Sequence, residues 1–587
     1  MRPYEDVMAN NVILLMKHCP SDVSTRKELL VSTRHILATE FRKGFFRHID
    51  VMMDERMISG SSRFSTVEQL RPLGYSILAD LIHHARTLLT PAQLARAVRI
   101  FSRVLHDADM DMPLSLQVNA VKLIMHLVDQ IFNNKDPNPQ VGRDLLLRIL
   151  SSFVQKVRTV REKIPELLVN VEKEIQERSE ASEGGGITVL KSTSCKTDED
   201  ANGVISSPTS QLRDLQSLLR SLFQAMKTVV WCISNYAQQR EKERQRALSA
   251  GEEQFPLPSF ATTKENDEIN SAMLKLTNGE RELVSEYIVW GLPCLRAFRI
   301  THHPSGSLLP TSPPPQYREM VEAFASSLTV LDGFNIRKTM VPNLPIIMKE
   351  LDKDPELITM FKYLLLNNGK NVSYECCDLV FGHLVDNLEV LSYINTPDDV
   401  THLQHIDEND SNEERQSNEI TLSKRGQNLY KLFIIVFSSL SKYSKNETAI
   451  LPHLLTFVPD CIRRSMEGHT WPGPYLSILR MLFQTLGGKF DASNKEMVPL
   501  LPTILNGFYR IYLATKNEQL RLMIVELMLT IAPRTEIEVL PHLPLLVKVL
   551  IPALQSNRGD LVNIGLRTRE KLFMMILLCN HFRSKLF

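Results

Sequence analysis

Regularly spaced apolar side chains along residues 69–131 constrain the fold of this chain more than any other feature. In residues 69–86 they recur every three or four positions, which is the spacing of a helix with one buried face. These side chains are Leu70, Leu73, Ile77, Leu78, Leu81 and Ala85. The same spacing returns at Leu94, Val98, Phe101 and Leu105, and again at Leu116, Ala120, Leu123, Ile124, Leu127 and Ile131. The pattern predicts successive amphipathic helices.

A helix start is marked between the first two of these segments by Thr90-Pro91-Ala92-Gln93. A threonine side chain can cap the first turn, and proline fits there because that turn needs no N–H from it. Gln93 stands where a capping box requires a glutamine or glutamate. The first two helices are therefore predicted to form a helical hairpin.

A leucine-proline pair recurs near the other end of the chain, and each copy is predicted to begin an apolar helix. The pairs are Leu451-Pro452, Leu501-Pro502 and Leu540-Pro541. The last two prolines lie 39 residues apart, near the roughly 40–47-residue period of HEAT and armadillo repeats. The helix between them is predicted from Leu520, Ile524, Leu527, Met528 and Ile531. We therefore expect an all-α fold, a HEAT/armadillo-like α-solenoid of antiparallel helical hairpins.

Composition excludes several classes of protein. Lysine and arginine number 68 against 67 aspartates and glutamates, so the total charge indicates no nucleic-acid or anionic-membrane partner. The eight cysteines include no C-x-x-C pair, which argues against a zinc site or a disulfide framework and favours a reducing compartment. The apolar run at residues 12–16 is too short to span a membrane.

Polar stretches interrupt the helical pattern and are expected to be insertions into one superhelix. Their side chains cannot bury enough apolar surface to offset the entropy of ordering, so we expect disorder or surface loops. The predicted organisation is a HEAT block at 1–177, a disordered insertion at 178–210, a helical block at 211–300 with a charged, disordered loop at 238–270, a loop at 301–316, a HEAT block at 317–405, an acidic and polar loop at 406–426, and a C-terminal HEAT block at 427–587. That last block is predicted to be truncated.

Enzyme signatures are missing from the sequence. It contains no G-x-G-x-x-G, G-x-x-x-x-G-K-[ST], H-E-x-x-H or G-x-S-x-G, and no kinase H-R-D or D-F-G. We therefore expect no catalytic residue, no cofactor, no metal and no small-molecule substrate. The pair His83-His84 is interpreted as solvated or locally hydrogen-bonded, because adjacent positions on a helix diverge by ~100° and cannot face one ion. His302-His303 is interpreted in the same way, because the pair lies in a loop with no nearby cysteine or carboxylate.

Three further groups of residues have a functional and a structural interpretation. The pentads at residues 215–219 and 451–455 have the L-x-x-L-L form of some docking helices, but core packing is favoured because leucine is so common here. Ser207-Pro208 and Ser312-Pro313 could accept phosphate, although ordinary loop composition explains them better. Trp231, Trp290 and Trp471 serve equally as core fillers or partner anchors, and Trp471 is expected to be the most exposed.

The run at residues 70–86 closely resembles the TRRAP (transformation/transcription domain-associated protein) family, and the likeness covers nearly the whole chain outside the polar insertions. It continues at Arg34-His35-Ile36-Leu37, Asp54-Glu55, Val128-Asp129, Gly142-Arg143-Asp144-Leu145-Leu146, Leu500-Leu501-Pro502, Leu540-Pro541-His542-Leu543-Pro544 and Gly565-Leu566-Arg567-Thr568. Members are giant helical scaffolds related to phosphatidylinositol-3-kinase-like kinases, with a kinase-shaped region that lacks catalytic residues. The present chain resembles an internal HEAT segment.

The resemblance implies a non-catalytic scaffold subunit of SAGA and NuA4-type histone acetyltransferase complexes in the nucleus. Its expected partners are transcription activators and subunits of those complexes, with no direct contact to nucleic acid or membrane. The alternative is a free-standing HEAT-repeat cargo or transport adaptor, which an acidic or aromatic ladder on the inner helices would favour. A true lipid or protein kinase is disfavoured, because no phosphate-binding or metal-binding motif is present. The sequence assigns no residue to partner binding.

Overall fold

The computed structural model is built almost wholly of helices, as the sequence predicts. It describes residues 3–19, 22–59, 64–106, 114–133, 139–183, 207–249, 276–299, 315–367, 370–392, 394–395, 421–467, 471–486, 497–531, 539 and 541–586. The middle of each predicted polar insertion lies outside the described residues, as do His302-His303 and Ser312-Pro313. The chain divides into two compact units, residues 1–347 and 348–587, and the division falls inside helix α13.

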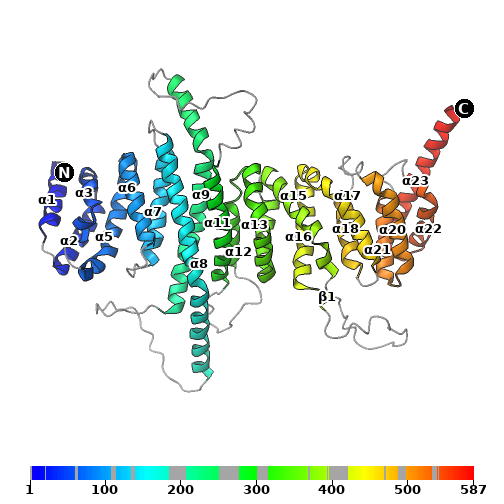
Figure 1. Cartoon of the computed structure of the whole chain (residues 1–587), viewed down its shortest axis with the longest axis horizontal. Coiled ribbons are helices and arrows are strands. Elements are labelled where there is room, and N and C mark those ends of the chain that lie inside the picture. The colour runs from blue at the N-terminus through cyan, green and yellow to red at the C-terminus, as the bar shows by residue number, and fades with distance from the viewer. Residues whose placement is uncertain are drawn as a thin grey trace. The chain divides into compact units, whose positions relative to one another are not determined.

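The helices of the first unit follow one another side by side (Figure 1), and their contacts place them in two rows. Helices α2, α5, α7, α9 and α12 each contact the next in one row, and α6, α8 and α11 form the second row. Contacts between α6 and α7 and between α8 and α9 join the rows. The elements are α1 (Pro3–His18), α2 (Val23–Leu37), η1 (Glu40–His48), α3 (Ile49–Met52), α4 (Glu55–Ser59), α5 (Phe64–Ala85), η2 (Arg86–Leu88), α6 (Pro91–His106), α7 (Leu114–Asn133), α8 (Pro139–Glu183), α9 (Pro208–Ser249), α11 (Asn278–Cys294), η3 (Leu295–Phe298), α12 (Pro315–Ser326) and α13 (Gly333–Lys353).

The predicted start of α6 is confirmed in detail. The Thr90 N–H donates to Gln93 Oε1 at 3.0 Å, and the Gln93 N–H donates to Thr90 Oγ1 at 3.3 Å, so the two residues cap the helix reciprocally. The predicted apolar stripes of α5, α6 and α7 are buried, except that Leu73 is half-buried. Local sequence is therefore sufficient to predict where these helices lie along the chain and which faces they bury.

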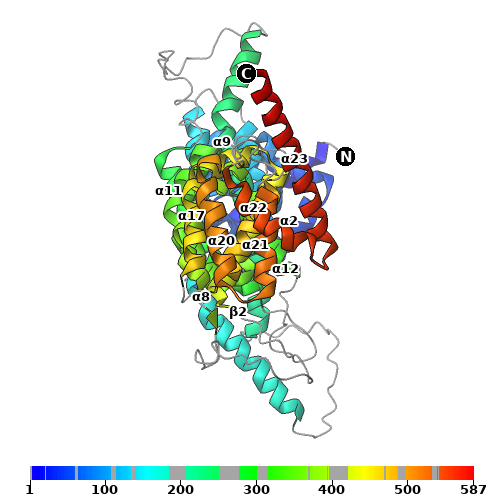
Figure 2. The same ribbon diagram turned by 90° about the vertical axis from the view of Figure 1, so that its right-hand side faces the viewer.

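Helices α8 and α9 extend past the limits that the sequence suggests, and Figures 1 and 2 show them reaching beyond their neighbours. Helix α8 continues to Glu183, while α9 begins at Pro208 and runs to Ser249, into the stretches expected to be disordered. The hydroxyl of Ser207 accepts the Ser210 N–H at 3.3 Å and so caps α9. Ser207 therefore belongs to a helix start and not to a loose loop.

The second unit repeats the two-row arrangement. Helices α14, α16, α18, α21 and α23 contact one another in succession, while α15, α17 and α20 form the other row and α22 packs on α21 and α23. The elements are η4 (Pro355–Leu357), α14 (Ile358–Leu366), α15 (Lys370–Asp386), η5 (Leu388–Ser392), β1 (Ile394–Asn395), β2 (Thr421–Leu422), α16 (Lys424–Lys442), α17 (Lys445–Met466), α18 (Gly473–Thr485), η7 (Val498–Leu500), α20 (Leu501–Ala514), α21 (Glu518–Ile531), α22 (Leu543–Leu554) and α23 (Gly559–Leu586). Contact with the nearest and the second-nearest helix is what stacked hairpins require.

One of the three leucine-proline predictions is wrong. Leu501-Pro502 begins α20 and Leu540-Pro541 precedes α22, whereas Pro452 lies inside α17. Proline removes a helical N–H, which leaves the carbonyl of Thr448 without its usual partner. Because Pro452 and Thr448 are both exposed, water can satisfy that carbonyl, and the helix continues.

The only strands among the described residues are β1 and β2, which pair antiparallel through Ile394 with Leu422 and Asn395 with Thr421. This ribbon does not alter the all-α class. The core of the second unit contains an aromatic cluster in which Phe381 lies 6.1 Å from Phe433 and 5.2 Å from Phe457, between ring centroids. These rings come from α15, α16 and α17, so aromatic packing joins both rows of the stack.

Candidate partner-binding site

The described residues contain no cluster of three or more histidine, cysteine or acidic side chains that could hold a metal ion. Within the same residues, no helix is both long enough and apolar enough to cross a bilayer. Burial raises the pKa of the Cys376 and Cys377 thiols to about 12, which disfavours the reactive thiolate at these two positions.

His83 and His84 do not converge on a common point. Their rings meet edge to face at 5.4 Å between centroids, and His83 also contacts the His126 ring at 4.8 Å. Arg86 Nη1 donates to the His83 carbonyl at 2.7 Å. Burial and the neighbouring Arg86 charge lower the pKa of His83, so the ring stays neutral beside the guanidinium. A packed, uncharged histidine fits this geometry.

The two L-x-x-L-L pentads differ in exposure. Leu215, Leu218 and Leu219 are all buried in α9, as core packing requires. In the second pentad Leu454 is buried, but Leu455 is 45% exposed on α17. The prediction that Leu455 packs in the core is therefore wrong. Pro452, one turn earlier, is exposed as well, so this part of α17 faces solvent.

The tryptophans also depart from expectation. Trp231 is 45% exposed, although its ring lies 5.3 Å from that of Phe132, while Trp471 is half-buried. The Trp471 ring covers Gly473, where a Cβ would come within 2.4 Å of its Nε1. Trp290 is held between helices, because the guanidinium carbons of Arg158 and Arg161 stand 5.1 and 4.8 Å from its ring centroid.

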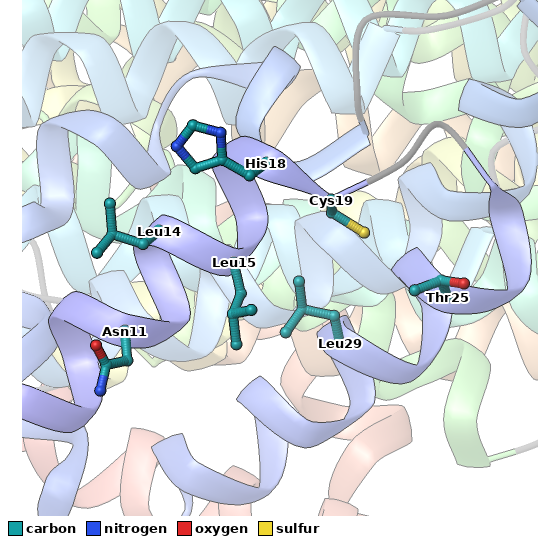
Figure 3. Close-up of a pocket in the computed structure, with 7 residues that line it drawn as sticks. All are labelled: Asn11, Leu14, Leu15, His18, Cys19, Thr25 and Leu29. Atoms are coloured by element: carbon teal, nitrogen blue, oxygen red, sulfur yellow. The ribbon is translucent and has the colours of Figure 1, made fainter.

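The first helix presents an apolar groove that sequence reasoning missed. Figure 3 shows its lining, in which Leu15 of α1 lies beside Leu29 of α2, while Leu14 projects from another side of α1. Asn11, His18, Cys19 and Thr25 complete a groove of about 640 Å³. Leu14 and Leu15 are 51% and 57% exposed. Exposed leucines at the edge of a groove are typical of surfaces that pack against another helix.

The groove belongs to a longer stripe along α1. Ala9, Val12, Ile13 and Met16 face the core, whereas Tyr4, Val7, Leu14 and Leu15 remain exposed on the same helix. Tyr4, Val7 and Leu14 lie on one side of the helix, where Asn11 and His18 are interspersed with them. The signal was available in the sequence, since α1 is apolar on two sides. This surface suits the apolar face of one further helix.

Comparison with known proteins agrees with the helical stack. The family model described as the Tra1 HEAT repeat central region matches residues 1–574. The transformation/transcription domain-associated protein of Danio rerio is 27% identical over 97% of this chain and 14% of its own length. The SAGA complex/NuA4 acetyltransferase complex subunit TRA1 of Saccharomyces cerevisiae is 24% identical over 97% of this chain and 16% of its own length.

A solved structure of the karyopherin Kap121p bound to the extreme C-terminus of the phosphatase Cdc14p aligns with 97% of this chain and 52% of its own, at 10% identity. Its TM-score of 0.22 carries no argument about function. The chain spans 14–16% of the length of the two curated relatives above. Because the family model covers nearly the whole sequence, the chain belongs to the family of the Tra1 HEAT repeat central region.

Proposed function

We propose that this chain is the central helical part of a non-catalytic scaffold subunit of SAGA and NuA4-type histone acetyltransferase complexes, and that it acts in the nucleus. The observation that carries the proposal is the family match over residues 1–574, together with relatives named as subunits of those complexes. The absence of enzyme motifs from the sequence fits a subunit that leaves acetyl transfer to others.

The proposed mechanism is recruitment. Transcription activators bind the scaffold weakly at several places, and each contact raises the effective concentration for the next. Two rows of stacked helices provide many exposed helix faces without requiring any one of them to bind tightly. The acetyltransferase subunits attached to the same scaffold are thereby held near the activator's DNA site.

The α1–α2 groove is the surface that we assign to a subunit of the complex. Its occupant is an amphipathic helix of that subunit, because Tyr4, Val7, Leu14 and Leu15 are exposed apolar side chains on α1 and most of the groove surface is apolar. Covering the exposed half of Leu14 and of Leu15 would stabilise such a contact by roughly 1 kcal/mol for each leucine, about half the value for burial of a fully exposed side chain.

The test is co-purification from nuclear extract with a tagged chain. We expect acetyltransferase-complex subunits with the natural sequence, and reduced recovery of at least one of them with Leu14→Glu/Leu15→Glu. The matched control is Leu88→Glu, since Leu88 is a 67% exposed leucine away from the groove. Loss of no subunit in the groove variant would refute the groove assignment, and recovery of none by the natural chain would refute the scaffold function.

A further inference from the structure

A polar groove lies between α6 and α8, in the second row of the first unit. It has a volume of about 530 Å³. Helix α6 supplies Ser102, Arg103 and His106, and one face of α8 supplies Arg148, Ser151, Ser152 and Gln155. Every lining residue can donate a hydrogen bond, and none is a carboxylate, an aliphatic residue, or a phenylalanine, tyrosine or tryptophan. Such a lining offers hydrogen-bond donors to an anion.

The surrounding helix faces strengthen the positive field. Helix α6 contains no aspartate or glutamate, and neither does α8 between residues 145 and 161. The same stretches carry Arg96, Arg99, Arg103, Arg148, Lys156, Arg158 and Arg161. Arg96, Arg103 and Arg158 each have one carboxylate at 3.9–4.0 Å, and the other four side chains have no such ion pair within the described residues. An excess of like charges raises the local concentration of anions and favours their binding. The balanced charge of the whole chain conceals this local excess.

Both groove arginines are available to a ligand. Within the described part of the chain Arg148 forms no ion pair and is exposed. Arg103 Nη1 is 3.9 Å from Glu55 Oε2, but Glu55 is held more closely by Arg71, whose Nη2 lies 2.8 Å from Oε1. The Tyr75 hydroxyl also donates to Glu55 Oε1 at 2.9 Å. Arg103 is therefore only weakly neutralised, and its side chain is 68% exposed.

His106 holds the hydroxyl group of Ser152 at one side of the groove. Its Nε2 is 3.0 Å from the Ser152 carbonyl oxygen and 3.1 Å from Ser152 Oγ. A carbonyl oxygen only accepts, so this network assigns the proton to Nε2. Burial and the charge of Lys156 lower the pKa of His106, which keeps the ring neutral. Burial, with Lys163 nearby, lowers the pKa of Lys156 to about 8, so a bound anion would also stabilise the charge of that ammonium.

We propose that the α6–α8 groove binds a phosphorylated serine or threonine in an acidic segment of a partner protein. A phosphate offers several strong acceptor oxygens, which suits two guanidinium groups beside serine hydroxyls. The lining lacks the apolar residues that would anchor a lipid and the aromatic rings on which bases stack. The choice of a protein as the partner rests on the scaffold function proposed above.

The test is fluorescence anisotropy with the full chain and a labelled peptide whose one phosphoserine is flanked by glutamates. We expect the phosphopeptide to bind at least about tenfold more tightly than its unphosphorylated form, with affinity that falls as salt rises. Arg148→Gln should weaken the binding of the phosphopeptide by roughly tenfold. The control Lys122→Gln removes one exposed charge from α7 and should leave the affinity unchanged. Circular dichroism confirms that each variant is folded.

Equal affinity for the two peptides, or no effect of Arg148→Gln, would overturn the proposal. Competition arms with inositol hexakisphosphate and with a single-stranded RNA identify other occupants. If either binds more tightly than the phosphopeptide and is lost in Arg148→Gln, the groove serves that ligand and the assignment to a phosphoprotein is wrong. The assay uses purified chain, so a negative result leaves the co-purification test of the scaffold function untouched.

Discussion

Replacing Leu78 by aspartate is expected to unfold the part of the first unit that surrounds α5. Leu78 is 1% exposed, and α5 packs against both α2 and α7. The substitution buries an unpaired charge in an apolar site, at a cost of roughly several kcal/mol. Limited proteolysis and amide hydrogen exchange should show loss of protection in α2, α5 and α7.

The matched control for this prediction is Leu88→Asp, which makes the same change at a leucine that is 67% exposed. That variant should keep the protection of the natural chain within about 0.5 kcal/mol, because a charge in solvent costs little. In a repeat protein, local unfolding is expected to spread mainly to the neighbouring hairpins. Normal protease resistance of Leu78→Asp would show that the buried face of α5 has been misassigned.

The second large effect is expected at an ion pair that joins α8 to α11. Arg143 Nε and Nη2 donate to the two carboxylate oxygens of Glu280 at 2.9 and 2.8 Å. Glu280 is 1% exposed and also caps α11, since its Oε2 accepts the Thr277 N–H at 2.7 Å. Arg143→Met leaves this carboxylate buried without its guanidinium. We expect a loss of about 3–5 kcal/mol in the free energy of unfolding.

A double-mutant cycle separates the pair from its parts. Glu280→Gln should cost less than Arg143→Met, because a neutral amide oxygen still accepts the Thr277 N–H. Adding Glu280→Gln to Arg143→Met should restore stability, since no buried charge is then left unpaired. The control is Arg47→Met, which breaks an exposed pair with Asp6 and should cost less than about 1 kcal/mol. Strictly additive losses in urea titrations would contradict the prediction.

Sequence reasoning succeeded where the determinants are local. The stripes of α6, α7 and α21 and the Thr90–Gln93 cap depend on residues within a few positions of one another. It failed at Pro452, because the exposure of that turn of α17 depends on how the adjacent helices pack against it. It also ended α8 and began α9 a few residues too far inward, since polar composition does not by itself end a helix.

Contacts between distant residues could not be predicted. Arg143 and Glu280 are 137 positions apart, and nothing in either local pattern indicates the partner. The α6–α8 groove left a trace in the acid-free stretches of both helices, but only the packing of α6 on α8 brings them to one surface. The α1–α2 groove was visible in principle as a helix with two apolar sides. A partner-binding surface can therefore be recognised only in the folded structure, whereas individual helices can be predicted from the sequence.

The scaffold function is tested most directly by immunoprecipitation from nuclear extract with an antibody raised against residues 178–210. We predict a very large antigen that co-purifies with acetyltransferase-complex subunits, as the size of the relatives and their names suggest. Mass spectrometry identifies the subunits, and the gel gives the size of the antigen. An antigen near 67 kDa without those subunits would contradict the account and would favour a free-standing HEAT-repeat adaptor.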